Sequence, residues 1–127
     1  MIEEFNKFIP EILEKAGAEA LRLRKNLKID YKTDSGDEAV DIVTNADKAV
    51  QELILSELLK TPLSECRLLA EEDTESVESF TNTGKYLLSL DPIDGTFNYA
   101  KKPGSIHWQI IIQLKSQFQF LTTAIYY

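Results

Sequence analysis

A chain of 127 residues has room for one domain, and its composition, 43% hydrophobic and 28% charged, is typical of a globular rather than a disordered protein. The 21 acidic and 14 basic residues give a net charge of -7, which argues against a nucleic-acid polymer as partner. The single cysteine excludes an internal disulfide, and neither a signal peptide nor a membrane span is visible. We therefore expect a soluble, cytoplasmic protein.

The first part of the chain carries two helical patterns. Over residues 2–23 apolar side chains recur at steps of three and four, which predicts a long helix that Pro10 kinks or restarts. A short strand around residues 29–32 and a loop follow. A second helix should run over residues 44–60, because an apolar stripe continues to that point and Pro62 then stops it.

The remaining elements are predicted strands. Residues 66–70 and 86–90 are apolar runs of the length of buried strands, and acidic residues follow each of them. Residues 106–114 and 118–127 are rich in β-branched and aromatic side chains and predict a β-hairpin. Its last strand should leave an apolar sheet edge open, which favours pairing with a second copy or another chain.

The acidic residues that follow the two buried strands predict a metal site. Asp91 and Asp94 lie three apart across the rigid Pro92, so both carboxylates and the carbonyl of Ile93 can face one point. Glu71 follows the other strand. Mg²⁺ prefers oxygen ligands of this kind, completed by water and substrate phosphate. The sequence therefore predicts a Mg²⁺ site suited to the hydrolysis of phosphate esters.

Each part of this pattern also has a purely structural interpretation. Residues 91–96 fit an ordinary Asx-type turn, and residues 71–72 fit a solvated loop. Gly95 lets backbone N–H groups approach an anion such as phosphate, particularly if a short helix begins there. Thr44 and Asp47 have the spacing of a helix capping box.

Three segments together resemble a known family. Residues 90–98, Leu-Asp-Pro-Ile-Asp-Gly-Thr-Phe-Asn, are similar to the signature of the inositol monophosphatase family of Mg²⁺-dependent, lithium-sensitive phosphatases. Residues 70–72, Ala-Glu-Glu, resemble its upstream metal motif, and residues 41–47, Asp-Ile-Val-Thr-Asn-Ala-Asp, resemble the start of its second helix. The three segments agree with the family in order and spacing.

The resemblance implies a role for each matching residue. The implied Mg²⁺ ligands are Glu71, Asp91, the carbonyl of Ile93, and Asp94. Gly95 and Thr96 would donate to the substrate phosphate. Thr96 and Asp47 would polarise the attacking water, with Asp47 accepting the proton, and Glu71 would help to orient that water.

Four other residues receive no assigned catalytic role. Lys32 resembles a family lysine near the metal, but extra residues separate it from the next motif, and a solvated lysine fits equally well. His107 and Trp108 have no partner motif, and a lone histidine is more often structural than a ligand. Cys66 lies in an apolar run and is interpreted as a core residue.

The implied fold is α+β, the N-terminal half of the layered α/β/α/β/α sandwich of the inositol monophosphatase and fructose-1,6-bisphosphatase superfamily. Residues 1–127 would be a single, C-terminally truncated domain without the family's third metal-binding aspartate. The implied reaction is hydrolysis of a small polyol phosphate, such as inositol monophosphate, by a metal-activated water. The alternatives are the 3'(2'),5'-bisphosphate nucleotidase branch, the fructose-1,6-bisphosphatase branch, and an inactive remnant that binds only metal or a partner.

Overall fold

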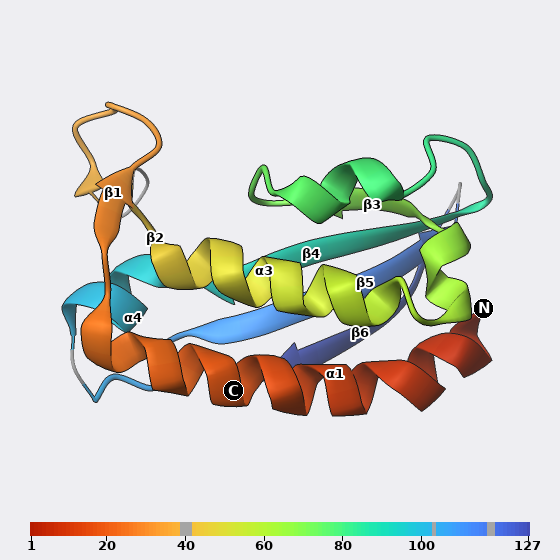
Figure 1. Cartoon of the computed structure of the whole chain (residues 1–127), viewed down its shortest axis with the longest axis horizontal. Helices are drawn as coiled ribbons and strands as arrows, with labels where there is room; N and C mark the ends of the chain where they lie inside the picture. Colours follow the sequence, from red (N-terminus) through yellow and green to blue (C-terminus); the bar gives the residue numbers. More distant parts are fainter. Residues whose placement is uncertain (39–41, 103, 117–118) are drawn as a thin grey trace.

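The computed structural model describes residues 1–38, 42–102, 104–116 and 119–127. Two long helices, α1 (Ile2–Leu23) and α3 (Asn45–Leu58), pack against each other and across one face of a four-stranded sheet (Figure 1). In spatial order the strands are β3 (Arg67–Ala70), β4 (Tyr86–Asp94), β5 (Gln109–Ser116) and β6 (Phe120–Tyr126). β3 is parallel to β4, and the other neighbours are antiparallel.

Shorter elements connect these layers. The strands β1 (Ile29–Tyr31) and β2 (Ile42–Thr44) pair antiparallel beside the start of α3, and they lie near α4 (Thr96–Lys101) in Figure 1. The 3-10 helices are η1 (Arg24–Asn26), η2 (Pro62–Glu65) and η3 (Glu75–Ser79). In the described part of the chain no helix is both long and apolar enough to cross a membrane.

The helix predicted from residue 2 to residue 23 is confirmed as α1, and it continues through Pro10 without a break. Pro10 lies on the exposed side, where water can reach the carbonyl that loses its N–H donor. The opposite side of the helix is buried and consists of Phe5, Ile9, Ile12, Leu13, Ala16, Gly17 and Ala20. This side faces the sheet, so its burial fixes the orientation of α1.

The central strands β4 and β5 alternate between buried and partly exposed residues over most of their length. Leu88 and Leu90 of β4 point into the core with three residues of β5, which are Ile110, Ile112 and Leu114. Their neighbours Ser89 and Asp91 are only half-buried, as the two-residue period of a strand requires. Asp91 therefore lies on the sheet face that α1 and α3 leave uncovered.

Two sequence predictions were wrong in their bounds. The strand expected to end at residue 90 continues to Asp94, with a shift of register between Asp91 and Asp94. The predicted hairpin is present, but its first strand begins at Gln109 rather than at residue 106. Cys66 is buried, which confirms it as a core residue. β6 ends the sheet order, so within the described residues it has a strand partner on one side only.

Candidate metal and phosphate site

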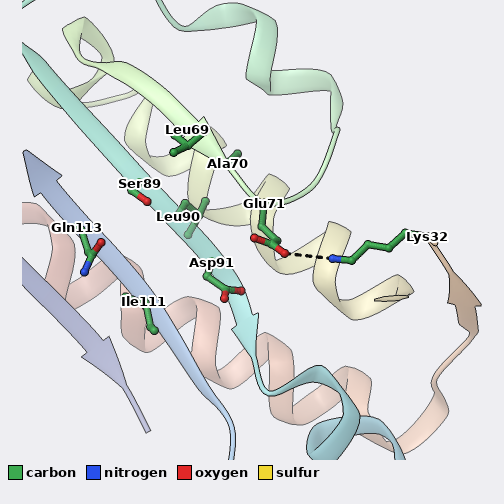
Figure 2. Close-up of a pocket in the computed structure, with 9 residues that line it drawn as sticks. All are labelled: Lys32, Leu69, Ala70, Glu71, Ser89, Leu90, Asp91, Ile111 and Gln113. Carbon is green, nitrogen blue, oxygen red and sulfur yellow. Dashed lines mark hydrogen bonds and ion pairs between the residues drawn. The ribbon is translucent and has the colours of Figure 1, made fainter. Parts of the chain in front are cut away.

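Two carboxylates come together where β3 ends beside the continuing strand β4. Ala70 lies opposite Leu90 in the strand register, so the residues that follow, Glu71 and Asp91, come to the same edge of the sheet. The N–H of Glu71 donates to the carbonyl of Leu90 at 3.0 Å, which extends the ladder by one residue. Both side chains line a cavity of about 560 Å³ (Figure 2).

The shift of register in β4 brings Asp94 to the same place. Asp94 pairs with Gln109 of β5, whose Nε2 donates to Asp94 Oδ2 at 2.8 Å. A second cavity of about 360 Å³ shares part of its lining with the first, and its residues include Lys32, Glu71, Asp91, Ile93, Asp94, Gly95 and Thr96. All the residues predicted to bind metal or phosphate thus line one continuous region.

This region concentrates negative charge. Burial, together with the nearby carboxylates of Glu71, Asp94 and Asp47, raises the pKa of Asp91 to about 7. Among the described residues, the carboxylate of Asp91 has no hydrogen-bond or ion-pair partner. A buried charge without a partner is costly, so the site is suited to receive a cation.

The carboxylates do not form a closed cage. Within the described ranges, no three side chains of Asp, Glu, His or Cys gather closely enough to hold a metal ion by themselves. Mg²⁺ is usually held by one or two carboxylates, with water and substrate phosphate as the other ligands. The open donor set of Glu71, Asp91, Asp94 and the Ile93 carbonyl therefore fits this ion.

Lys32 lies in the site, which favours the first of its two sequence interpretations. Its Nζ is 3.2 Å from Glu71 Oε1, the contact drawn in Figure 2, and 3.2 Å from Glu72 Oε1. Burial alone would lower the pKa of Lys32, but its hydrogen bonds to Glu72 and Glu71 outweigh burial and raise the pKa. The ammonium group neutralises part of the negative charge. Of the two glutamates, Glu72 points inward and is 7% exposed, whereas Glu71 faces the cavity.

Gln51, which was not predicted from the sequence, holds the loop after β3 through its hydrogen bonds. Its side chain is fully buried, and its Nε2 donates to the carbonyl of Glu72 and to Thr74 Oγ1, both at 2.8 Å. Its Oε1 accepts from the N–H of Glu72 at 3.0 Å. The only signal in the sequence was an amide side chain beside Val50 on the apolar stripe of α3.

Asp47 connects the start of α3 with the start of α4. The predicted capping box is confirmed, because Thr44 N–H and Thr44 Oγ1 donate to Asp47 Oδ2 at 2.8 and 2.6 Å. The other carboxylate oxygen, Oδ1, accepts from Thr96 Oγ1 at 2.9 Å. Thr96 Oγ1 also lies 2.9 Å from the carbonyl of Ile93. Asp47 is 1% exposed, so its cap and its contact with Thr96 coexist in the core.

Gly95 occupies a position that tolerates no side chain. Its φ of +85° lies in the left-handed region, and an added Cβ would be 2.7 Å from the carbonyl oxygen of His107. We expect Gly95→Ala to cost roughly 1–2 kcal/mol for the backbone conformation alone, and more because of this contact. Gly36→Ala is the matched control, since Gly36 has a φ of +87° and nothing within 4 Å.

Denaturant unfolding of both variants tests this prediction. Gly95→Ala should lower the free energy of unfolding further than Gly36→Ala does, and the difference reports the contact with His107. Equal losses in the two variants would contradict a close approach of the two backbones at Gly95.

Comparisons with known proteins show the family to which the chain is similar. The family model described as the inositol monophosphatase family matches residues 1–106. Inositol monophosphatase 2 of Mus musculus is 33% identical over 98 residues, which are 77% of this chain and 33% of that protein. The chain thus spans about a third of the length of the curated relatives it matches.

Solved structures of the same kind share the fold. A staphylococcal inositol monophosphatase-1, soaked in LiCl as an inhibitory complex, has a TM-score of 0.77 at 25% identity and matches 99% of this chain and 44% of its own. An IMPase/NADP phosphatase complexed with NADP and Ca²⁺ has a TM-score of 0.76 at 27% identity, over 99% of this chain and 45% of its own. These likenesses confirm the predicted α+β fold.

Proposed function

Because this chain belongs to the inositol monophosphatase family, we propose that it contributes the metal and phosphate site of a Mg²⁺-dependent phosphomonoesterase. The observation that carries the proposal is that Glu71, directly after β3, lies beside Asp91 of the parallel strand β4, with Asp94 lining the same cavity. The proposed substrate is a small polyol phosphate such as inositol monophosphate. Residues 1–127 would form one domain.

Four groups would hold the ion: the carboxylates of Glu71, Asp91 and Asp94, and the carbonyl of Ile93. When bound, Mg²⁺ would lower the pKa of a coordinated water and offset the charge of the phosphate oxygens. The unpartnered carboxylate of Asp91 and its raised pKa support this assignment. Lys32 would offset part of the negative charge of Glu71 and Glu72 through its two contacts of 3.2 Å.

The remaining groups act on the water and the phosphate. The Thr96 hydroxyl has one proton, which it donates toward Asp47 Oδ1 or the Ile93 carbonyl, both at 2.9 Å. Its lone pairs therefore remain available to accept a proton from water, while Asp47 accepts the proton of Thr96. Gly95, with no side chain, would let the backbone approach a phosphate oxygen, and the Thr96 hydroxyl lies beside it.

The test is Mg²⁺-dependent release of phosphate from inositol monophosphate by the 127-residue chain, with Asp94→Asn as the comparison. We expect release that requires Mg²⁺ and is lost in Asp94→Asn, because this change removes one proposed ligand. Release that is equal without Mg²⁺ or in the variant would reject the proposed site. Binding of Mg²⁺ without hydrolysis would support a binding role for this chain instead.

The substrate class has a separate test. One structural relative is an IMPase/NADP phosphatase solved with NADP, so a nucleotide phosphate is a reasonable competitor for the polyol phosphate. Turnover of inositol monophosphate, NADP, a 3',5'-bisphosphate nucleotide and fructose bisphosphate should be compared at equal Mg²⁺. Faster turnover of a nucleotide or of the bisphosphate sugar than of inositol monophosphate would reject the proposed substrate but keep the proposed reaction.

A further inference from the structure

Arg24 lies in η1, directly after α1, and its guanidinium group contacts the C-terminal end of α4. Nε donates to the carbonyl of Tyr99 at 2.9 Å, and Nη1 donates to that of Ser105 at 2.9 Å. Nη2 donates to the carbonyl of Lys102 at 2.9 Å and to that of Asn98 at 3.3 Å. One side chain thus serves four backbone carbonyls at and beyond the C-terminal end of the helix.

These contacts decide where α4 lies. A helix of six residues is too short to be stable by itself, so tertiary contacts must hold it. The carbonyl of Asn98 also accepts from the N–H of Lys102 at 3.2 Å. The last carbonyls of a helix carry the negative end of its dipole, where a cation is favourable. Arg24 also lies 5.4 Å from the centroid of the Tyr99 ring and 5.9 Å from that of Trp108, and the Tyr99 hydroxyl donates to the carbonyl of Ala20. Arg24 and Ala20, at the C-terminal end of α1, therefore contact the C-terminal end of α4.

The other end of α4 carries the proposed chemistry. Thr96 is its first residue, and the Thr96 hydroxyl meets Asp47 of α3 at 2.9 Å. A shift of the short helix along or about its axis would change this distance, because no residue between Thr96 and Lys101 can absorb the movement in a rigid helical turn. The placement of Thr96 therefore depends on a residue 72 positions earlier in the sequence.

We propose that Arg24 is a positioning residue, which fixes the C-terminal end of α4 and thereby holds the Thr96 hydroxyl against Asp47. Its consequence for catalysis rests on the function proposed above, whereas the mechanical link between Arg24 and Thr96 does not. Lysine cannot replace it, because an ammonium group has three donors at one point and cannot reach four separated carbonyls. Arg24→Ala should loosen the C-terminal end of α4 the most, and Arg24→Lys should loosen it less.

Amide exchange and NMR spectra of the ligand-free chain test the link directly. The matched control is Arg22→Ala, since Arg22 lies two residues earlier, in the last turn of α1, and is exposed, with its ion pair to Glu19. In Arg24→Ala we expect the amides of Tyr99 and Lys102 to exchange at least roughly tenfold faster relative to those of α3, and the signals of Thr96 and Asp47 to shift. In Arg24→Lys the exchange rates and the NMR signals should lie between those of Arg24→Ala and those of the native chain. Arg22→Ala should leave the exchange rates and the signals unchanged.

Two results would overturn the proposal. Unchanged exchange in α4 would show that Arg24 does not hold the helix, and an equal acceleration in α1, α3 and α4 would show only a loss of global stability. Where the native chain releases phosphate, Arg24→Ala should lower kcat with unchanged affinity for Mg²⁺, and it should add nothing to the loss caused by Thr96→Val. If the native chain releases none, the proposed function fails, and the exchange and NMR results still decide the role of Arg24.

Discussion

Asp91→Asn should make the metal-free chain more stable and, at the same time, remove its stabilisation by Mg²⁺. Burial and the carboxylates of Glu71, Asp94 and Asp47 raise the pKa of Asp91 to about 7, so the folded chain holds this charge at a cost. Asparagine has nearly the same shape and no charge. After allowance for the screening of a partly exposed group, we expect a gain of about 1–2 kcal/mol near neutral pH.

The gain in free energy of unfolding of Asp91→Asn should be small at acidic pH and larger at neutral pH. A group whose pKa in the folded state lies above its ordinary value of 3.8 contributes stability that is fully present below that value. That contribution is lost as the pH rises through about 7. The difference in free energy of unfolding between Asp91→Asn and the native chain, measured in a chelator, should therefore increase from acidic to neutral pH. A difference that is constant with pH would contradict the raised pKa.

With Mg²⁺ present, the native chain should become more stable than Asp91→Asn, which reverses their order of stability in the chelator. An ion that binds only the folded chain stabilises it by about 2.7 kcal/mol at one hundred times its dissociation constant. We expect this increase in the native chain and none in Asp91→Asn, measured by thermal unfolding with and without Mg²⁺. Glu78→Gln is the control, because Glu78 is an exposed acid in η3 outside the site, and it should respond to Mg²⁺ like the native chain. A variant at Asp91 that still responds fully would exclude this residue as a ligand.

The sequence was sufficient to predict the elements whose signals are local. The apolar period of residues 2–23 and the cap formed by Thr44 and Asp47 involve residues only a few positions apart, and both are confirmed. The end of β4 was not predictable in this way. Asp-Pro-Ile-Asp favours a turn, but β5 supplies a partner through Gln109, and this pairing keeps the segment in the sheet.

Gln51 and Arg24, which support the site, were missed for a related reason, and Lys32 was singled out only by the resemblance to the family. Lys32 reaches Glu71 across 39 positions, Gln51 reaches Glu72 across 21, and Arg24 reaches Ser105 across 81. No short-range periodicity in the sequence links such pairs, because only the folded chain brings them together. The carboxylates themselves were recognisable because they follow directly after apolar runs of the length of buried strands, whereas the cations and amides that contact them come from other elements.

Removal of the Thr96 hydroxyl should strongly reduce the rate of catalysis. Thr96→Val keeps the shape of the side chain and leaves Asp47 Oδ1 and the Ile93 carbonyl without their shared donor at 2.9 Å. A positioned proton acceptor typically contributes 10²–10⁴-fold to a rate, so we expect roughly this loss in kcat. Thr96→Ser retains the hydroxyl and should retain most of the activity, measured as Mg²⁺-dependent release of phosphate.

Asp47→Asn should reduce kcat by a similar factor, because an amide is a far weaker proton acceptor than the carboxylate that now meets Thr96 Oγ1. It should also cost about 1 kcal/mol of stability, since Asp47 is part of the cap of α3. If the two residues act as one relay, the double variant Asp47→Asn with Thr96→Val should be no slower than either single variant. Multiplied losses in the double variant would instead show that Asp47 and Thr96 act independently, with Asp47 needed mainly to hold the start of α3.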